Sequence, residues 1–428
     1  MNNIYVFPTF LLWVISSSSK MQLLSILSNQ MVFQQRIKVN LWGEVEPNGQ
    51  MTIKYSCISN CEEITLKDIL KGKVWFRTKQ SNISIPLQER NGQLIKGANK
   101  VLIKVQEKIA SKFFAIACKT SVAQLENTGG EWLRFSPENL QKTSGVDCFS
   151  GQLLQEILNI PIGLVLFSCR DSKIKAWLDY KVVDDMLGVL LHHSLYQLCN
   201  AMIYPFRYFT IEGFLWHQGE NNQIAPKTTR LFPELPKSFC KVWELGNLPF
   251  YYARLTPCKC NGAEKAPNVR VRKVQMQNKK KTSNAGMVIT LDVGDGKYGH
   301  LIKKRKIGQR LVYLSLAKIY GCEEFRYQLP VCESAEIREQ EAFFSFENSS
   351  YYIVFPLVNL KNFEVTGRDR VAHQGKVGIN IQTQHVIATS KNIIFPIAVY
   401  YVCEQYTKTF FMIMPILPFR SDDWSLDY

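Results

Sequence analysis

The residues best suited to chemistry lie in three polar segments that each follow an apolar run. Ser81 ends one such run, and His300 follows another together with a pair of aspartates. The third segment, residues 216–222, passes abruptly from apolar side chains to amides, a glycine and a carboxylate. A serine becomes a nucleophile when a base removes its proton and donors stabilise the resulting oxyanion. Serine, histidine and an amide-rich segment therefore indicate acyl transfer.

The base of such a pair needs a carboxylate to orient its imidazole ring. Either Asp292 or Asp295 could serve His300 in this way, and the sequence does not choose between them. Asp295 is our candidate for the catalytic carboxylate. The other histidines fit the role less well, because they lie in a helical stretch, in the β-rich tail or inside the amide-rich segment: His192, His193, His373, His385 and His217.

Buried strands must position these groups. Continuous apolar runs predict four of them, each ending in polar residues: 74–76, 161–167, 209–216 and 286–291. Stretches of helical periodicity alternate with them at 137–158, 182–202 and 307–320, the last closed by a glycine in the C-cap position. This alternation predicts an α/β domain with a parallel sheet flanked by helices. The polar ends should then meet at one edge of the sheet, where open α/β sheets place active sites.

The flanking regions have a different pattern. Residues 1–19 fit a secretory signal peptide, although no Lys or Arg precedes the apolar core, and this predicts a secreted, periplasmic or lysosomal-type location. Short alternating strands predict a small β-rich unit at 20–70 and a second one at 323–428, on either side of the α/β domain at 71–322.

Composition narrows the classes of function. Hydrophobic residues make up 46% and charged residues 21% of the 428 residues, as in an ordinary globular protein without stable membrane insertion. The net charge of +16 would suit an acidic partner, but the basic residues are scattered and no nucleic-acid-binding motif occurs, so we expect no nucleic acid.

The twelve cysteines lack the spacing of a zinc site, and no metal or other cofactor is expected. Most lie in apolar surroundings and are predicted to be small core residues, for example Cys118, Cys148 and Cys199. Their disulfide pairing cannot be deduced from the sequence alone.

Several segments, in order from about residue 25 to 424, have the form of known motifs. Residues 74–82 are similar to "VWLCSGQSNM", 200–203 with 216–222 to "NAMI…WYQGEAN", and 291–300 to "LDIGDPxDIHP". Further matches lie at 31–43 ("MVLQQ…WG"), 161–177 ("PIGLIxSSWGGTPxEAW") and 418–424 ("PFRTDDW"). Together they resemble the sialate O-acetylesterases of the bacterial secreted type, within the SGNH-like hydrolases.

The resemblance implies an SGNH-like, flavodoxin-like fold and a metal-independent esterase acting on O-acetylated sialic acid or a related glycan. Ser81 would attack the acetyl carbonyl and His300 would relay the proton, giving an acetyl-enzyme that water hydrolyses. The backbone amide of Ser81 and donors from the region of Gln218 would hold the oxyanion. The rest of that segment would support the site: Gly219, Glu220 and Asn222.

Some positions depart from the family pattern. Lys79 stands where the motif has glycine beside the nucleophile, and Arg170 and Asp171 replace paired glycines after the second strand. Tyr298 and Leu301 replace motif residues on either side of the histidine. A misplaced oxyanion donor costs about 10²–10³ in rate. The alternative reading is therefore a catalytically impaired member that only binds acetylated or acidic glycans.

Overall fold

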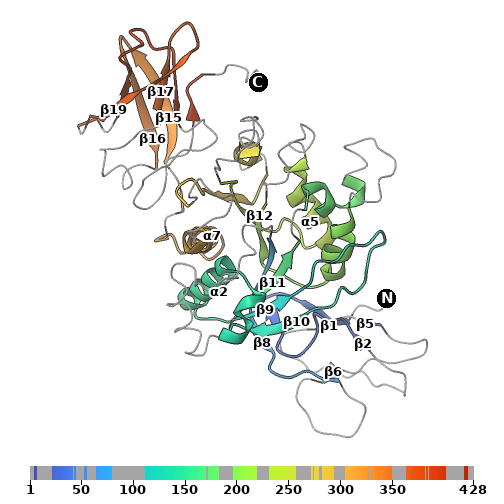
Figure 1. Ribbon diagram of the computed structural model, residues 1–428. Coiled ribbons are helices and arrows are strands. Elements are labelled where there is room, and N and C mark those ends of the chain that lie inside the picture. Colours follow the sequence, from blue (N-terminus) through green and yellow to red (C-terminus); the bar gives the residue numbers. More distant parts are fainter. Residues whose placement is uncertain are drawn as a thin grey trace.

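The longest apolar runs form adjacent strands of one sheet in the computed structural model (Figure 1). β8 (Leu70–Lys79) is central, with β11 (Ile162–Ser168) and β12 (Gly213–His217) parallel to it on either side. Within the described residues the strand order is β10-β9-β11-β8-β12-β13-β14. The additional strands are β9 (Lys112–Ala115), β10 (Glu131–Arg134), β13 (Phe250–Ala253) and β14 (Ala285–Val288). The expected parallel sheet is confirmed; β10 alone of these seven strands runs antiparallel to its neighbour.

The structure describes nineteen stretches of the chain: residues 4–6, 22–41, 43–44, 53–54, 64–79, 111–169, 172–182, 196–218, 231–256, 271–272, 274–278, 282–293, 304–325, 327–328, 330–348, 363–380, 382–383, 385–401 and 419–422.

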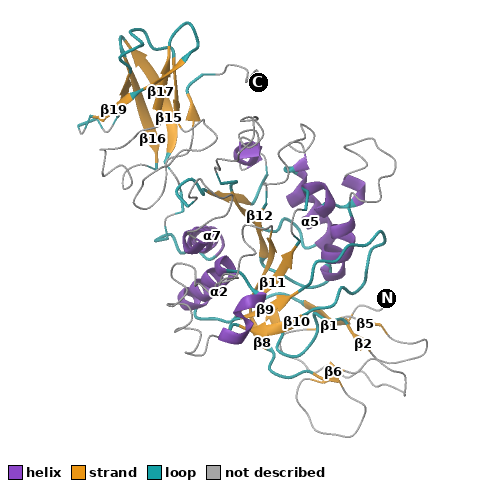
Figure 2. Ribbon diagram, viewed as in Figure 1, coloured by secondary structure: helices purple, strands orange, loops and turns teal. Residues whose placement is uncertain are grey.

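Helical segments cover both faces of the sheet, as Figure 2 shows. α2 (Gly145–Leu158) and α7 (Lys304–Ile319) lie side by side on one face of the sheet. They cover the apolar side chains of alternate strand residues, which point toward this face. α5 (Glu234–Trp243) packs on the other face, against a core rich in aromatic rings. Four short turns of helix complete these layers: η1 (Pro137–Lys142), η2 (Ile174–Trp177), η3 (Cys199–Ile203) and η4 (Tyr204–Phe206).

Element boundaries follow local chemistry. Ser144 accepts a hydrogen bond from the amide of Asp147, which begins α2 eight residues later than the periodicity suggested. Gly321, at φ +69°, follows α7 as expected. β12 begins at Gly213 instead of residue 209, because the preceding residues form a short helix and a turn in which Phe209 N–H donates to the Phe206 carbonyl.

Short strands precede the main sheet. β3 (Val32–Gln34) pairs parallel with β8, so part of this β-rich region extends the central sheet. Three small pairs accompany it. Their members are β1 (Ile4–Val6), β4 (Val39–Leu41), β2 (Gln22–Leu23), β5 (Gly43–Glu44), β6 (Ile53–Lys54) and β7 (Ile64–Thr65). β1, inside the stretch expected to be a signal peptide, pairs antiparallel with β4; the signal itself stays a prediction.

Two antiparallel sheets form the C-terminal region, as expected from its alternating pattern (Figure 1). The first contains β15 (Val331–Arg338), β16 (Glu341–Glu347), β19 (Lys376–Ile379) and β20 (Val386–Thr389). The second contains β17 (Phe363–Thr366), β18 (Ala372–Gln374), β21 (Ala398–Tyr401) and β22 (Phe419–Arg420). Ile393 makes only an isolated bridge, and strand pairing in β21 starts at Ala398. Most of the helical stretch expected at 182–202 lies outside the described residues, namely 183–195.

Candidate active site

The carboxyl ends of the three central strands meet at one edge of the sheet. Lys79 of β8 is paired with Ser168 of β11 and with His217 of β12, so the three strands end side by side. Ser81 comes two residues after the end of β8. Most of the predicted site residues lie outside the described part of the chain: Ser81, Gly219, Glu220, Asn222, Asp295 and His300, and also Arg170 and Asp171. Their roles stay predictions.

Lys79 has a regular backbone in spite of the glycine that the motif has at this position. It belongs to β8 and is in register with both neighbouring strands, and the left-handed region contains no residue of this strand. An extended backbone is open to any residue type. The lysine is therefore compatible with the conformation at the end of β8.

Gln218 is described, and it joins two of the strand ends. Its side chain is buried, and Nε2 donates to the carbonyl oxygen of Ser172, 2.7 Å away, in the segment that follows β11. Its Oε1 is buried without a hydrogen-bond partner. A buried acceptor left unpaired costs about 1–3 kcal/mol. Oε1 is thus an enclosed acceptor whose hydrogen-bonding capacity is unused within the described residues.

Gln275 is a supporting residue for which the sequence held no signal, since it belongs to no motif. It is fully buried, its Nε2 donates to the Gln218 carbonyl (3.3 Å), and its Oε1 accepts from the Leu255 amide (2.8 Å). The Tyr252 hydroxyl donates to its carbonyl oxygen. One glutamine therefore connects the segments after β12 and β13.

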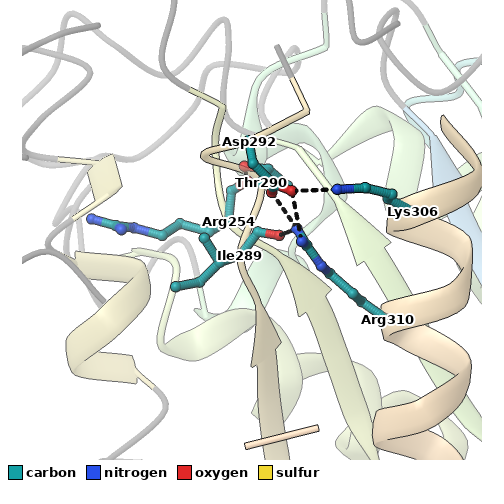
Figure 3. A network of polar contacts seen from close by, with 6 residues as sticks. All are labelled: Arg254, Ile289, Thr290, Asp292, Lys306 and Arg310. Atoms are coloured by element: carbon teal, nitrogen blue, oxygen red, sulfur yellow. Dashed lines mark hydrogen bonds and ion pairs between the residues drawn. The ribbon is translucent and has the colours of Figure 1, made fainter. Parts of the chain in front are cut away.

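Asp292 follows β14 and is held by two cations (Figure 3). Arg310 of α7 donates to both carboxylate oxygens, at 2.7 and 2.9 Å, and Lys306 Nζ lies 2.9 Å from Oδ2. Arg310 also donates to the Ile289 carbonyl at 2.7 Å. Burial alone would raise the pKa of Asp292, but the hydrogen bonds and charges of Arg310 and Lys306 outweigh burial and lower that pKa. Asp292 is thus an ionised anchor that fixes the end of β14 to α7.

The same end of β14 is fixed to its neighbour β13. Thr290 Oγ1 donates to the Arg254 carbonyl at 2.7 Å, and the Arg254 amide donates to the Val288 carbonyl at 2.9 Å. Figure 3 shows Thr290 and Arg254 beside the network of Asp292. The segment that leads to Asp295 and His300 therefore starts from a rigid point.

His217 lies at the end of β12, 2% exposed, and neither ring nitrogen has a hydrogen-bond partner. Burial lowers the pKa of His217 to about 3, and the positive charges of Arg77 and Lys304 contribute to this shift. The imidazole is therefore neutral at neutral pH. In the resembling motif this position is tyrosine.

The segment after β11 is held by a disulfide between Cys118 and Cys169, whose Cα atoms are 5.0 Å apart. The expectation that Cys118 is a core residue is wrong: it is exposed and bonded. Its partner directly follows β11, so the bond joins the segments that follow β9 and β11. Cys148 and Cys199 are buried, as predicted, and neither forms a disulfide.

Among the described residues, no helix has the length and apolar character to cross a membrane, and no group of three or more His, Cys, Asp or Glu is arranged to hold a metal ion.

Comparison with known proteins shows which family part of the chain matches. The carbohydrate esterase family of sialic acid-specific acetylesterases matches residues 123–316, a stretch that contains Gln218 and His300 but not Ser81. This stretch belongs to the sialic acid-specific acetylesterase family. The resemblance noted from the motifs is thereby confirmed at the level of the family.

Relatives of known identity are distant. The sialate O-acetylesterases of Pongo abelii and Homo sapiens are each 23% identical over 329 residues, which cover 68% of this chain and 61% of theirs. The chain thus spans about three fifths of the length of these relatives.

The crystal structure of a carbohydrate acetylesterase from Xanthomonas citri is similar at a TM-score of 0.77 and 22% identity, covering 95% of this chain and all of that one. The fold is accordingly the SGNH-like carbohydrate esterase fold, with two antiparallel β sheets added.

Proposed function

We propose that the protein is a serine esterase that removes O-acetyl groups from sialic acid or a related acetylated sugar. Ser81 Oγ attacks the acetyl carbonyl carbon while His300 accepts the hydroxyl proton, and the same proton then goes to the departing sugar oxygen. Water, deprotonated by His300, next attacks the acetyl-serine, and His300 returns that proton to Ser81 Oγ as the ester bond breaks and acetate leaves. Asp295 orients the imidazole in this proposal.

The observation that carries the proposal is the position of β8 between β11 and β12. The strand that leads to Ser81 is flanked by the strands that lead to Arg170 and to Gln218, within a chain whose residues 123–316 belong to an acetylesterase family. Active sites of open α/β sheets lie at this edge. Gln218 supports this arrangement, because its contact with the Ser172 carbonyl ties the end of β12 to the segment that follows β11.

The runner-up is a catalytically impaired member that binds acetylated or acidic glycans without cleaving them. Arg170 and Asp171 favour it, because they stand where the motif has glycines. Lys79 does not favour an impaired enzyme, because its backbone is extended and a glycine is not needed at this position.

An assay with 4-nitrophenyl acetate and O-acetylated sialic acid separates the two. We expect wild type to release acetate from both substrates, and Ser81→Ala to lose at least about 10³-fold in kcat. Ser345→Ala, a serine of the C-terminal β16, should match wild type. The esterase proposal fails if wild type turns over neither substrate or if Ser81→Ala is as active as wild type. Binding of the acetylated sugar by an inactive wild type would establish the runner-up.

A further inference from the structure

A charged pair is buried beneath the nucleophile strand. Arg77 of β8 is 1% exposed, and its Nε lies against Oδ1 of Asp147, a residue of α2 that is fully buried. Arg77 Nη1 donates to Ser150 Oγ at 3.0 Å. A buried ion pair is rarely a net gain in stability over apolar side chains of the same size. Its presence directly after the buried apolar residues 74–76 therefore calls for another reason.

The first turns of α2 are built to hold this arginine. Ser144 Oγ donates to Oδ2 of Asp147 at 2.6 Å and accepts from its amide at 3.2 Å. The carboxylate thus sits in the first turn of the helix, where the helix dipole stabilises a negative charge. Ser150 donates to the Val146 carbonyl (2.7 Å), which leaves its oxygen aimed at Arg77. Contacts within α2 and its N-cap therefore fix both acceptors of the guanidinium, the Asp147 carboxylate and Ser150 Oγ.

The place of the pair in the sheet connects it with the site. Arg77 is in register with Leu166 of β11 and Leu215 of β12, so the pair lies at the carboxyl half of all three central strands. Ser81 follows Arg77 by four residues. The pair therefore anchors α2 to the last strand residues before the nucleophile segment.

We propose that Arg77 is a positioning residue for the esterase reaction: its contacts with Asp147 and Ser150 fix the direction in which β8 leaves the sheet and hence the position of Ser81. This inference rests on the proposed function. A displacement of about 1 Å caused by a change away from the chemistry can cost 10²-fold in rate. The effect should fall on kcat, because the pair itself lies below the surface that binds substrate.

A second ion pair, whose cation also lies on β8, provides the control. Lys73 of β8 and Glu212, which directly precedes β12, form an ion pair of 2.8 Å with side chains 13% and 11% exposed. Neutralising it as Lys73→Met/Glu212→Gln removes one charge of each sign near the amino end of β8, eight residues before Ser81 in the sequence. Neutralising the inferred pair as Arg77→Met/Asp147→Asn is the test.

Three measurements are made on each protein: kcat and KM for O-acetylated sialic acid, the rate at which a fluorophosphonate labels Ser81, and the midpoint of thermal unfolding. We expect Arg77→Met/Asp147→Asn to lose about 10²-fold in kcat and in labelling rate with KM within about threefold, whereas the control pair keeps both rates. Arg77→Lys retains the charge but not the fork of contacts, and should lose about tenfold in both rates while remaining folded.

The inference is overturned if the Arg77→Met/Asp147→Asn protein keeps wild-type kcat and labelling, if Arg77→Lys does so, or if both neutralised pairs lose rate equally. A wild type that neither cleaves acetate esters nor reacts at Ser81 would overturn the proposed function, and this inference with it. Loss of turnover with normal labelling of Ser81 would leave the proposed function standing and contradict the positioning role.

Discussion

At the scale of single residues, the environment of His217 is the most unusual in the described site. Its imidazole is buried with two unpartnered nitrogens, next to the charges of Arg77 and Lys304. A protonated ring there would meet two like charges without water. The His217 imidazole is therefore neutral in the folded protein near neutral pH. Because the unfolded chain binds the proton more readily, the stability of the fold depends on pH.

The pH dependence has a definite sign. The pKa of His217 is about 3 in the folded protein against an ordinary value of 6.5, so below pH 6.5 only the unfolded chain takes up the proton. The contribution of neutral His217 to the free energy of unfolding is therefore complete above about pH 6.5. It is lost as the pH falls toward 3, at up to about 1.4 kcal/mol per pH unit. Urea unfolding of wild type and His217→Asn between pH 4.5 and 8 checks this. The variant should lose less stability per pH unit below 6.5, with equal slopes above 7; identical slopes below 6.5 would contradict the assignment.

At the scale of elements, the sequence predicted the strands and helices whose local pattern of residues matches their burial in the fold. β11 and β12 are continuous apolar runs buried on both faces, and α7 ends at a glycine in the left-handed region, so pattern and structure coincide. β9 and β13 have only four residues each, too few for periodicity to register. Short strands of this kind are defined by their neighbours in the sheet.

Contacts between distant segments could not be read from the sequence. Cys118 and Cys169 are 51 residues apart, and their pairing depends on β9 and β11 being neighbours. Gln275 has no motif, and its role exists only because β12 and β13 end side by side. The strand ends that meet at the candidate site were predictable, whereas the side chains that tie them together were not.

The contact of α2 with α7 gives an element-scale prediction. A Cβ on Gly308 of α7 would lie 2.9 Å from Ser150 Oγ and 3.0 Å from the Val146 carbonyl oxygen, both on α2. Gly308→Val should therefore push the helices apart and lower the free energy of unfolding by about 1–3 kcal/mol, measured by urea unfolding. Gly378 of β19 has open space around it, and Gly378→Val is the control that should change stability little. Equal stability of the two variants would refute the close contact.

At the scale of the whole molecule, charge is the property that concerns the substrate. The chain carries a net charge of +16, and a sialic acid carries a carboxylate that is ionised at neutral pH. The summed field of many scattered cations attracts such an anion over a distance comparable with the Debye length.

Salt should therefore act on acidic and neutral substrates differently, provided that the proposed function holds. We expect kcat/KM for O-acetylated sialic acid to fall by up to about tenfold as NaCl rises from about 20 to 500 mM, because the Debye length shrinks from about 20 Å to a few ångströms and screens the attraction. Screening weakens the encounter between enzyme and substrate and leaves the chemical step unchanged, so the loss should appear in KM while kcat stays constant. 4-Nitrophenyl acetate, which is uncharged, is the internal control and should keep its kcat/KM over the same range. An equal fall for both substrates would mean that salt alters the enzyme itself, and no fall for either would mean that the net charge has no part in substrate capture.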